Sequence, residues 1–256
     1  MTIDGGAHVV LVTGASRGIG AATARAFAAA GASVVLVARD AQRLATVRDE
    51  IAAAGGTAIA LPADVSESGA TEAMVGRAVG EFGRLDVAVN AAAAHGSRPR
   101  PLAEVPPDEF DAAITVTLRG TFLSMRSEIP AMIATGGGAI VNVASTAGLR
   151  SLAGLAGYVA AKRALIGLTE SAALDYAAQG VRINAIAPGP IHTEQLDRAG
   201  AAAREHVARA VPAKRLGTVD EVAAAIRWLC APEAAFVTGS TLVIDGGLLA
   251  GTPTFA

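Results

Sequence analysis

The chain has 256 residues, of which 52% are hydrophobic and only 17% are charged. Because charged residues make up about 25% of an ordinary globular chain, this composition excludes an intrinsically disordered protein. The net charge of −2 offers no basic excess for a nucleic-acid backbone, and a lone Cys230 excludes an intrachain disulfide. No apolar stretch approaches the roughly 18 residues of a spanning helix, and residues 1–7 lack the basic residues of a secretory signal. We therefore expect a cytoplasmic protein that acts on neither nucleic acids nor membranes.

Short apolar runs rich in β-branched residues alternate with alanine-rich segments of helical period along the chain. The runs predict strands at 8–13, 33–38, 57–61, 85–90, 139–144, 181–187 and 241–244. The segments between them predict helices near 18–30, 40–54, 67–82, 107–134, 157–179 and 219–230. This alternation indicates an α/β fold with a doubly wound, parallel, seven-stranded sheet and helices on both faces. Since no linker or internal repeat divides the chain, we expect one domain over residues 1–256.

The first predicted strand runs directly into a glycine-rich turn, Thr13–Gly20 (TGASRGIG), and then into an alanine-rich helix. Glycine lets the backbone approach a pyrophosphate closely, and the free N–H groups of a helix N-terminus attract phosphates. A turn between a strand and a helix is the context that a dinucleotide-binding fingerprint requires. The predicted cofactor-binding residues of this turn are Gly14, Ser16, Arg17, Gly18, Ile19 and Gly20.

The end of the second predicted strand favours a phosphorylated dinucleotide. Ala38 stands where a carboxylate would bind a free ribose 2′-hydroxyl, and Arg39, which follows it, suits a 2′-phosphate. Arg17 is a second cation for the same phosphate. We therefore expect NADP(H) to be preferred over NAD(H). Asp40 leaves an alternative open, because it either caps the next helix or competes for the ribose.

Two segments interrupt the alternation of strands and helices, and each follows the carboxyl end of a predicted strand. The segment 95–107 contains four prolines, and the segment 188–217 holds a short polar helix. Open α/β sheets bind ligands at the carboxyl ends of their strands, so both segments are predicted to shape a substrate pocket. His95, His192 and Glu194 are the candidates for substrate contact, with a solvated loop residue as the alternative for each.

A serine, a tyrosine and a lysine form the predicted catalytic set. Ser145 ends the fifth predicted strand, and Tyr158 and Lys162 follow at a spacing that places both on one helix face. A free tyrosine has a pKa near 10, and an ammonium group one turn away favours its phenolate. The serine hydroxyl can hydrogen-bond a substrate oxygen. This combination predicts acid–base chemistry at a carbonyl or alcohol group.

Taken in order, these motifs resemble those of the short-chain dehydrogenase/reductase family from Val9 to about Gly247. The resemblance rests on TGASRGIG at 13–20, DV at 64–65, the Asn90 segment, Ser145, YVAAK at 158–162, PGPIHT at 188–193 and TGSTLVIDGG at 238–247. It implies a Rossmann-type fold and hydride transfer with a nicotinamide cofactor. Tyr158 would then be the general acid and base, Ser145 would polarise the substrate oxygen, and Lys162 would lower the Tyr158 pKa and bind the nicotinamide ribose.

The resemblance also implies further contacts and an assembly. Asp64 and Val65 would flank the adenine, and Asn90 and Ala91 would lie against the cofactor. The residues that would shape the nicotinamide site are Pro188, Gly189, Ile191 and Thr193. The long helices predicted at 107–134 and 157–179 would build a homodimer or homotetramer.

Two departures from the family pattern concern the active site. The family usually reads NNAG after the fourth strand, where this chain has Asn90 followed by three alanines. Thr117 stands where the family commonly has an asparagine that anchors a proton-relay water. Threonine still offers a donor and an acceptor, so the relay is either retained in altered form or weakened.

The sequence leaves three functions open. The first is an NADP(H)-dependent ketone reductase or alcohol dehydrogenase similar to 3-oxoacyl thioester reductases, which the intact Ser145, Tyr158 and Lys162 favour. The second is an ene reductase similar to 2,4-dienoyl-CoA reductases, some of which share the departures described above. The third is an NADP(H)-binding redox sensor without turnover. No metal is expected, because the four histidines and the single cysteine form no ligand-spaced cluster.

Overall fold

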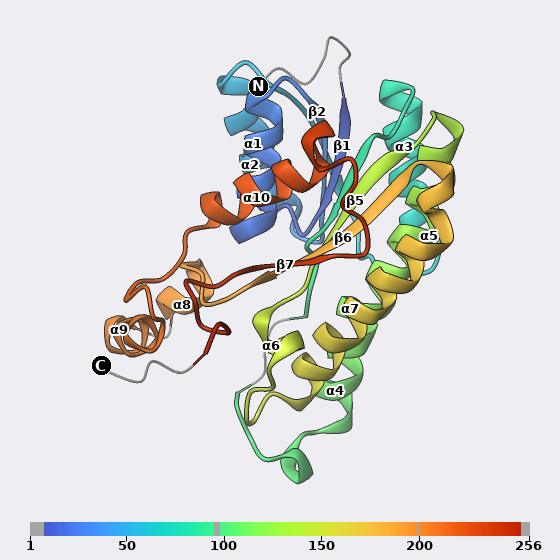
Figure 1. Ribbon diagram of the computed structural model, residues 1–256. Helices are drawn as coiled ribbons and strands as arrows, with labels where there is room; N and C mark the ends of the chain where they lie inside the picture. The colour runs from blue at the N-terminus through green and yellow to red at the C-terminus, as the bar shows by residue number, and fades with distance from the viewer. Residues whose placement is uncertain (1–7, 95–97, 199, 252–256) are drawn as a thin grey trace.

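Parallel strands form a single sheet in the order β3-β2-β1-β4-β5-β6-β7 (Figure 1). The structure is a computed structural model that describes residues 8–94, 98–198 and 200–251. The strands of this part of the chain are β1 (Val9–Thr13), β2 (Ser33–Ala38), β3 (Thr57–Pro62), β4 (Val87–Asn90), β5 (Gly138–Val143), β6 (Val181–Pro188) and β7 (Thr241–Ile244). Every neighbouring pair is parallel, which confirms the predicted fold class.

Helices cover both faces of the sheet. They are α1 (Gly18–Ala29), α2 (Ala41–Ala53), α3 (Ala70–Phe82), α4 (Pro107–Ala113), α5 (Gly120–Ala134), α6 (Thr146–Leu149), α7 (Ala156–Tyr176), α8 (Glu194–Arg198), α9 (Ala201–Ala210) and α10 (Val219–Cys230). Helices α1, α2 and α10 pack on one face, and α3, α5 and α7 pack on the other (Figure 1). None of the described helices is long and apolar enough to cross a membrane.

The strands are apolar on both sides because both faces of the sheet are covered. In β1, Val10 and Val12 belong to the core under α1, α2 and α10, whereas Val9 and Leu11 belong to the core under α3, α5 and α7. All four side chains are at most 2% exposed. Continuous apolar runs are therefore the correct signal for these strands, as the sequence analysis assumed.

The segment predicted as one helix at 107–134 is not a single α-helix in the structure. It consists of α4, a π-helical segment Ile114–Arg119, and α5 in direct succession. A π-helical segment inserts an extra residue per turn and often marks a functional site. It contains Thr117, the residue at the position of the family asparagine. The segment 188–217 differs as well, because it holds two short helices, α8 and α9, instead of one.

The connections place a binding site at the carboxyl ends of β1 and β4. From β1 the chain continues to β2 and β3 on one side of the sheet and then returns to β4 on the other side. In open α/β sheets such a reversal of strand order leaves a crevice for ligands. The glycine turn after β1 and the segment after β4 therefore lie next to each other at this crevice.

Candidate active site

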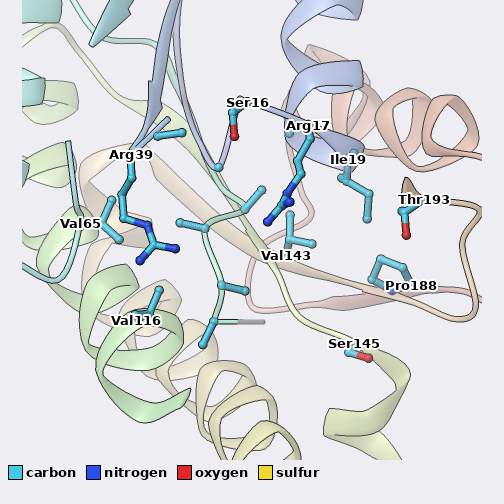
Figure 2. Close-up of a pocket in the computed structure, with 18 of the residues that line it drawn as sticks. Ser16, Arg17, Ile19, Arg39, Val65, Val116, Val143, Ser145, Pro188 and Thr193 are labelled. Atoms are coloured by element: carbon cyan, nitrogen blue, oxygen red, sulfur yellow. The ribbon is translucent and has the colours of Figure 1, made fainter. Parts of the chain in front are cut away.

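A cavity of about 770 Å³ opens at the carboxyl ends of the strands (Figure 2). It is bounded by the segments that follow β1, β2, β3, β4, β5 and β6. The predicted site residues that line it are Gly14, Ser16, Arg17, Gly18, Ile19, Gly20, Arg39, Asp64, Val65, Ala91, Ser145, Tyr158, Lys162, Pro188, Gly189, Ile191, Thr193 and Glu194. The tertiary structure thus brings the predicted cofactor residues and the predicted catalytic set into the same space.

The glycine turn is folded too closely for side chains at two of its positions. A Cβ added at Gly20 would lie 2.3 Å from the Gly14 carbonyl oxygen. Gly14 itself has φ of +68°, and its Cβ would lie 2.7 Å from the Ala91 carbonyl oxygen. The N-terminus of α1 has no side-chain cap, so its first backbone N–H groups remain available where the helix borders the cavity. This cradle fits the pyrophosphate of a dinucleotide.

Two arginines border the part of the cavity between β1 and β2. Figure 2 shows the side chains of Arg17 and Arg39 extending into the cavity. The Arg39 guanidinium lies 3.7 Å from a carboxylate oxygen of Asp64, which also accepts hydrogen bonds from Ser66. Asp40 accepts the backbone N–H of residue 43 at 3.0 Å and caps α2. The structure therefore favours the capping alternative for Asp40 over competition for a ribose.

An ion pair that was not predicted from the sequence joins two residues of the cavity wall. Arg43 in the first turn of α2 donates to Glu194 of α8 at 2.8 Å, and both residues line the cavity. The carboxylate raises the pKa of Arg43. Since 151 positions separate the two residues in the chain, no local pattern could have predicted this pair. Glu194, predicted as a substrate contact, lines the cavity and also joins the segment after β6 to α2.

The catalytic set comes together at the end of β5 and the start of α7. Ser145 caps α6 by accepting the Ala147 N–H at 3.1 Å, and its side chain lies close enough to Tyr158 to lower the pKa of that phenol. The Lys162 ammonium lies 5.8 Å from the centre of the Tyr158 ring. It donates to the Val143 carbonyl at 2.6 Å and is 3% exposed. The three side chains can therefore act on a single substrate oxygen in the cavity.

Burial acts against the predicted lowering of the Tyr158 pKa. Burial raises the pKa of Tyr158, and the hydrogen bond with Ser145 offsets this only in part. Burial also lowers the pKa of Lys162 to about 8. The lysine ammonium is directed at the Val143 carbonyl, and burial is the largest cause acting on the Tyr158 pKa. Tyr158 is accordingly a neutral phenol at neutral pH, with a proton to donate.

Asn90 does not lie against the cavity as predicted. Its side chain is 2% exposed, and its amide nitrogen donates to Glu128 on α5 and to Asn142 on β5. The reason is the alternation of side chains along a strand. Asn90 falls on the same face of β4 as Ala88, which packs under α3, α5 and α7, and Ala91 lines the cavity in its place.

Thr117 is likewise turned away from the cavity. It is 1% exposed, its hydroxyl oxygen accepts the Ala94 N–H at 3.2 Å, and its carbonyl accepts the Thr121 hydroxyl at 2.8 Å. Val116 lines the cavity instead. Thr117 therefore holds the segment after β4, which itself borders the cavity, and its hydroxyl is not presented to the catalytic set.

We expect Thr117→Val to raise KM more than it lowers kcat and to destabilise the fold by about 1 kcal/mol, because the Ala94 N–H loses its acceptor. Steady-state kinetics over a range of pH and urea unfolding check this. Thr117→Ser keeps the hydroxyl and is the matched control. A Thr117→Val enzyme whose pH profile shifted with unchanged KM would point to the proton relay and contradict the anchoring role.

One of the two predicted histidines, His192, does not join the site. His192 has a 54% exposed side chain whose Nε2 lies 2.9 Å from an Asp197 carboxylate oxygen, and it is not among the residues lining the cavity. It stabilises the turn into α8, so its predicted substrate contact is not supported. His95 lies outside the described residues.

Comparison with known proteins agrees with this geometry. A family model described as enoyl-(acyl carrier protein) reductase matches residues 14–249. The A-factor type gamma-butyrolactone 1′-reductase (1S-forming) of Streptomyces virginiae is 44% identical over 244 residues, which cover 94% of this chain and 95% of the relative. The cyclohexanol dehydrogenase of Acinetobacter sp. (strain SE19) is 42% identical over 238 residues, or 93% of each chain. The chain belongs to the short-chain dehydrogenase/reductase family.

A solved structure of this family shares the same fold. Levodione reductase superimposes with a TM-score of 0.92 at 34% identity, covering 96% of this chain and 98% of that chain. The relatives are named as dehydrogenases or reductases of alcohol and carbonyl groups. The protein is therefore an oxidoreductase of the short-chain dehydrogenase/reductase family that uses a nicotinamide cofactor on such groups.

Proposed function

We propose that this enzyme interconverts a ketone and a secondary alcohol with NADP(H), with Tyr158 as the general acid and base. One observation carries the proposal. Ser145, Tyr158 and Lys162 line the same cavity as the glycine turn and the arginines Arg17 and Arg39. Ser145 follows β5 and Tyr158 lies in the first turn of α7, whereas Arg17 and Arg39 follow β1 and β2. A cofactor held along the strand ends would bring its reactive end to the hydroxyl groups.

The chain supplies the proton chemistry of this reaction. A bound nicotinamide supplies or accepts the hydride. Ser145 donates a hydrogen bond to the substrate oxygen and holds it beside Tyr158. In reduction the Tyr158 hydroxyl gives its proton to that oxygen, and burial keeps the phenol protonated at neutral pH. Lys162 is anchored by the Val143 carbonyl next to the tyrosine ring, where its ammonium favours the phenolate that remains.

Relatives suggest the first substrates to try. The proteins named cyclohexanol dehydrogenase and levodione reductase point to cyclic ketones and their alcohols. We therefore expect the purified enzyme to oxidise NADPH when cyclohexanone or a 3-oxoacyl thioester is added, faster than it oxidises NADH at equal concentration. Oxidation only with a 2,4-dienoyl thioester would overturn the ketone assignment, and tight cofactor binding without any turnover would support a sensor.

The cofactor preference rests on the two arginines and is testable by itself. Arg39→Ala is expected to weaken NADPH binding by roughly 10- to 100-fold, the loss of a charge-assisted hydrogen bond of about 1.5–3 kcal/mol. NADH binding should stay within twofold, because NADH lacks the 2′-phosphate. Fluorescence titration measures both affinities. Arg48→Ala is the control, since Arg48 lies on α2 but pairs with Asp49. An equal loss for both cofactors would contradict the assignment.

A further inference from the structure

A buried carboxyl group lies just beneath the cavity, outside the set of residues assigned above. Glu128 on α5 is 0% exposed, and the Asn90 amide nitrogen donates to its Oε2 at 3.0 Å. The same nitrogen donates to the Asn142 side-chain oxygen at 3.1 Å. The three side chains thus form a polar chain between α5, β4 and β5, in a layer whose core is largely apolar.

Two oxygen atoms of these three side chains lack a hydrogen-bond partner. The Asn90 Oδ1 and the Glu128 Oε1 are both buried without a partner among the described residues. An ionised carboxylate offers acceptors only, so these two oxygens cannot bond to one another while Glu128 is charged. A protonated carboxyl has one O–H donor. Acid and amide side by side then form two reciprocal hydrogen bonds, N–H to Oε2 and O–H to Oδ1, which satisfy both atoms.

The surroundings of Glu128 agree with a neutral acid. Burial raises its pKa to about 8, against the hydrogen bond from Asn90, which lowers it. No charged group contributes to the shift among the described residues. The charged side chains on the elements around α5 are either exposed, as Glu170 and Asp175 of α7 are, or engaged elsewhere. Thr71 donates to Glu72, and Arg119 donates to the Ser66 carbonyl. Arg77 and Glu81 of α3 pair with each other, Arg182 of β6 donates to backbone carbonyls, and Lys162 of α7 donates to Val143.

The polar chain connects directly to the walls of the cavity. Asn90 and Asn142 are partners in the register of β4 and β5. Each is followed by a residue that lines the cavity, Ala91 and Val143, and the Val143 carbonyl holds Lys162 at 2.6 Å. The Asn142 amide nitrogen also donates to Thr169 on α7 at 3.0 Å. A displacement of the Glu128 side chain would therefore affect the ends of both β4 and β5, where they line the cavity.

We propose that Glu128 is a positioning residue that works as a neutral carboxylic acid, paired with Asn90, and thereby holds the ends of β4 and β5 where they form the cofactor cavity. Loss of the proton removes the donor between the two unpartnered oxygens. It leaves a buried negative charge on Glu128 that faces the Asn90 oxygen. The folded protein holds this proton more tightly than the unfolded chain, whose pKa is near 4.5. The stabilisation is therefore complete below about pH 4.5 and is lost as the pH rises through about 8.

Glu128→Gln tests the proposal with little change of shape. The glutamine amide donates to Asn90 Oδ1 at every pH and does not titrate. The urea midpoint of the variant should therefore rise relative to that of the wild type as the pH increases from 5 to 8. Glu170→Gln, at an exposed position of α7, is the matched control and should show no such divergence. If the urea midpoints of Glu128→Gln and the wild type change with pH in parallel, the proposal is overturned.

Cofactor affinity gives a readout that a purely structural role would leave unchanged. If only the neutral acid supports binding, the Kd of the wild type rises about tenfold per pH unit above the Glu128 pKa. Glu128→Gln should lack this component. Lys162 is common to both proteins, so its own titration cancels in the comparison. Binding is measured by calorimetry, at pH 7 and pH 9, with whichever of NADPH and NADH binds more tightly. The result is thus independent of turnover and of the proposed cofactor preference.

Infrared spectroscopy observes the proton directly. The wild type at pH 6 should show a carboxylic-acid carbonyl band that Glu128→Gln lacks and that titrates with a midpoint near pH 8. Should the variant fail to fold, the titration of this band in the wild type still decides between the two states. Absence of this band at pH 6 means that Glu128 is ionised there, and the proposal is then wrong.

Discussion

Tyr158→Phe is expected to lower kcat/KM by about 10²- to 10⁴-fold, the usual contribution of a positioned general acid. The substitution removes the one hydroxyl that can pass a proton to the substrate oxygen while it keeps the ring beside Lys162. Cofactor affinity should stay nearly unchanged, because the backbone of the glycine turn and the arginines are untouched. Stopped-flow measurement of NADPH oxidation separates this chemical step from product release.

The chain offers a matched control for this substitution, since it contains one other tyrosine. Tyr176 lies near the end of α7 and packs against the core under α3, α5 and α7, so Tyr176→Phe should keep full activity. The pH dependence gives a further check. Because burial raises the Tyr158 pKa, alcohol oxidation, which needs the phenolate, should accelerate with rising pH. Full activity of Tyr158→Phe would exclude Tyr158 as the acid.

Gly20→Ala is expected to destabilise the fold by about 1–3 kcal/mol and to abolish measurable cofactor binding. The added Cβ would lie 2.3 Å from the Gly14 carbonyl oxygen and 2.8 Å from its carbon. These are backbone atoms and cannot rotate away, so the whole turn must move. Since Gly14 also lies against Ala91, the displacement reaches both sides of the cavity. Urea unfolding and fluorescence titration with NADPH measure the two effects.

Gly76→Ala is a control that is expected to change the free energy of unfolding in the opposite direction. Gly76 is exposed within α3, and a Cβ there meets no atom within 4 Å. Alanine in an exposed helix interior is more favourable than glycine by about 0.5–1 kcal/mol, so this variant should be more stable than the wild type and bind the cofactor normally. If Gly20→Ala unfolds at the same urea concentration as the wild type, the close approach of the turn to α1 is not required.

The sheet and the placement of Tyr158 and Lys162 on one helix were predictable because their signals are local. Apolar runs bounded by turns identify strands buried on both faces, and all seven predicted strands appear in the sheet within two residues at each end. The spacing of Tyr158 and Lys162 places them on one helix face whatever the rest of the chain does. The glycine turn is equally local, since its function depends on the strand before it and the helix after it.

The remaining features depend on packing between segments that are distant in the chain. Arg43 and Glu194 form their pair only because the segment after β6 crosses to α2. Thr117 matches the position of the family asparagine, yet a π-helical turn directs its hydroxyl to Ala94. In the sequence, Glu128 is simply a charged residue in a helix, and only the sheet beneath α5 makes it a fully buried acid beside Asn90.

The pKa of Tyr158 also depends on both local spacing and the packing of distant segments. From the sequence alone, the neighbouring lysine predicts a lowered value, because charge attraction follows from helical spacing. In the tertiary structure the phenol is removed from water, and this burial raises its pKa, while the lysine donates to the Val143 carbonyl. Sequence periodicity determines which residues share a face of a strand or helix. Burial and the partners of each polar group are decided only when distant segments pack together, and these set the charge states on which the chemistry depends.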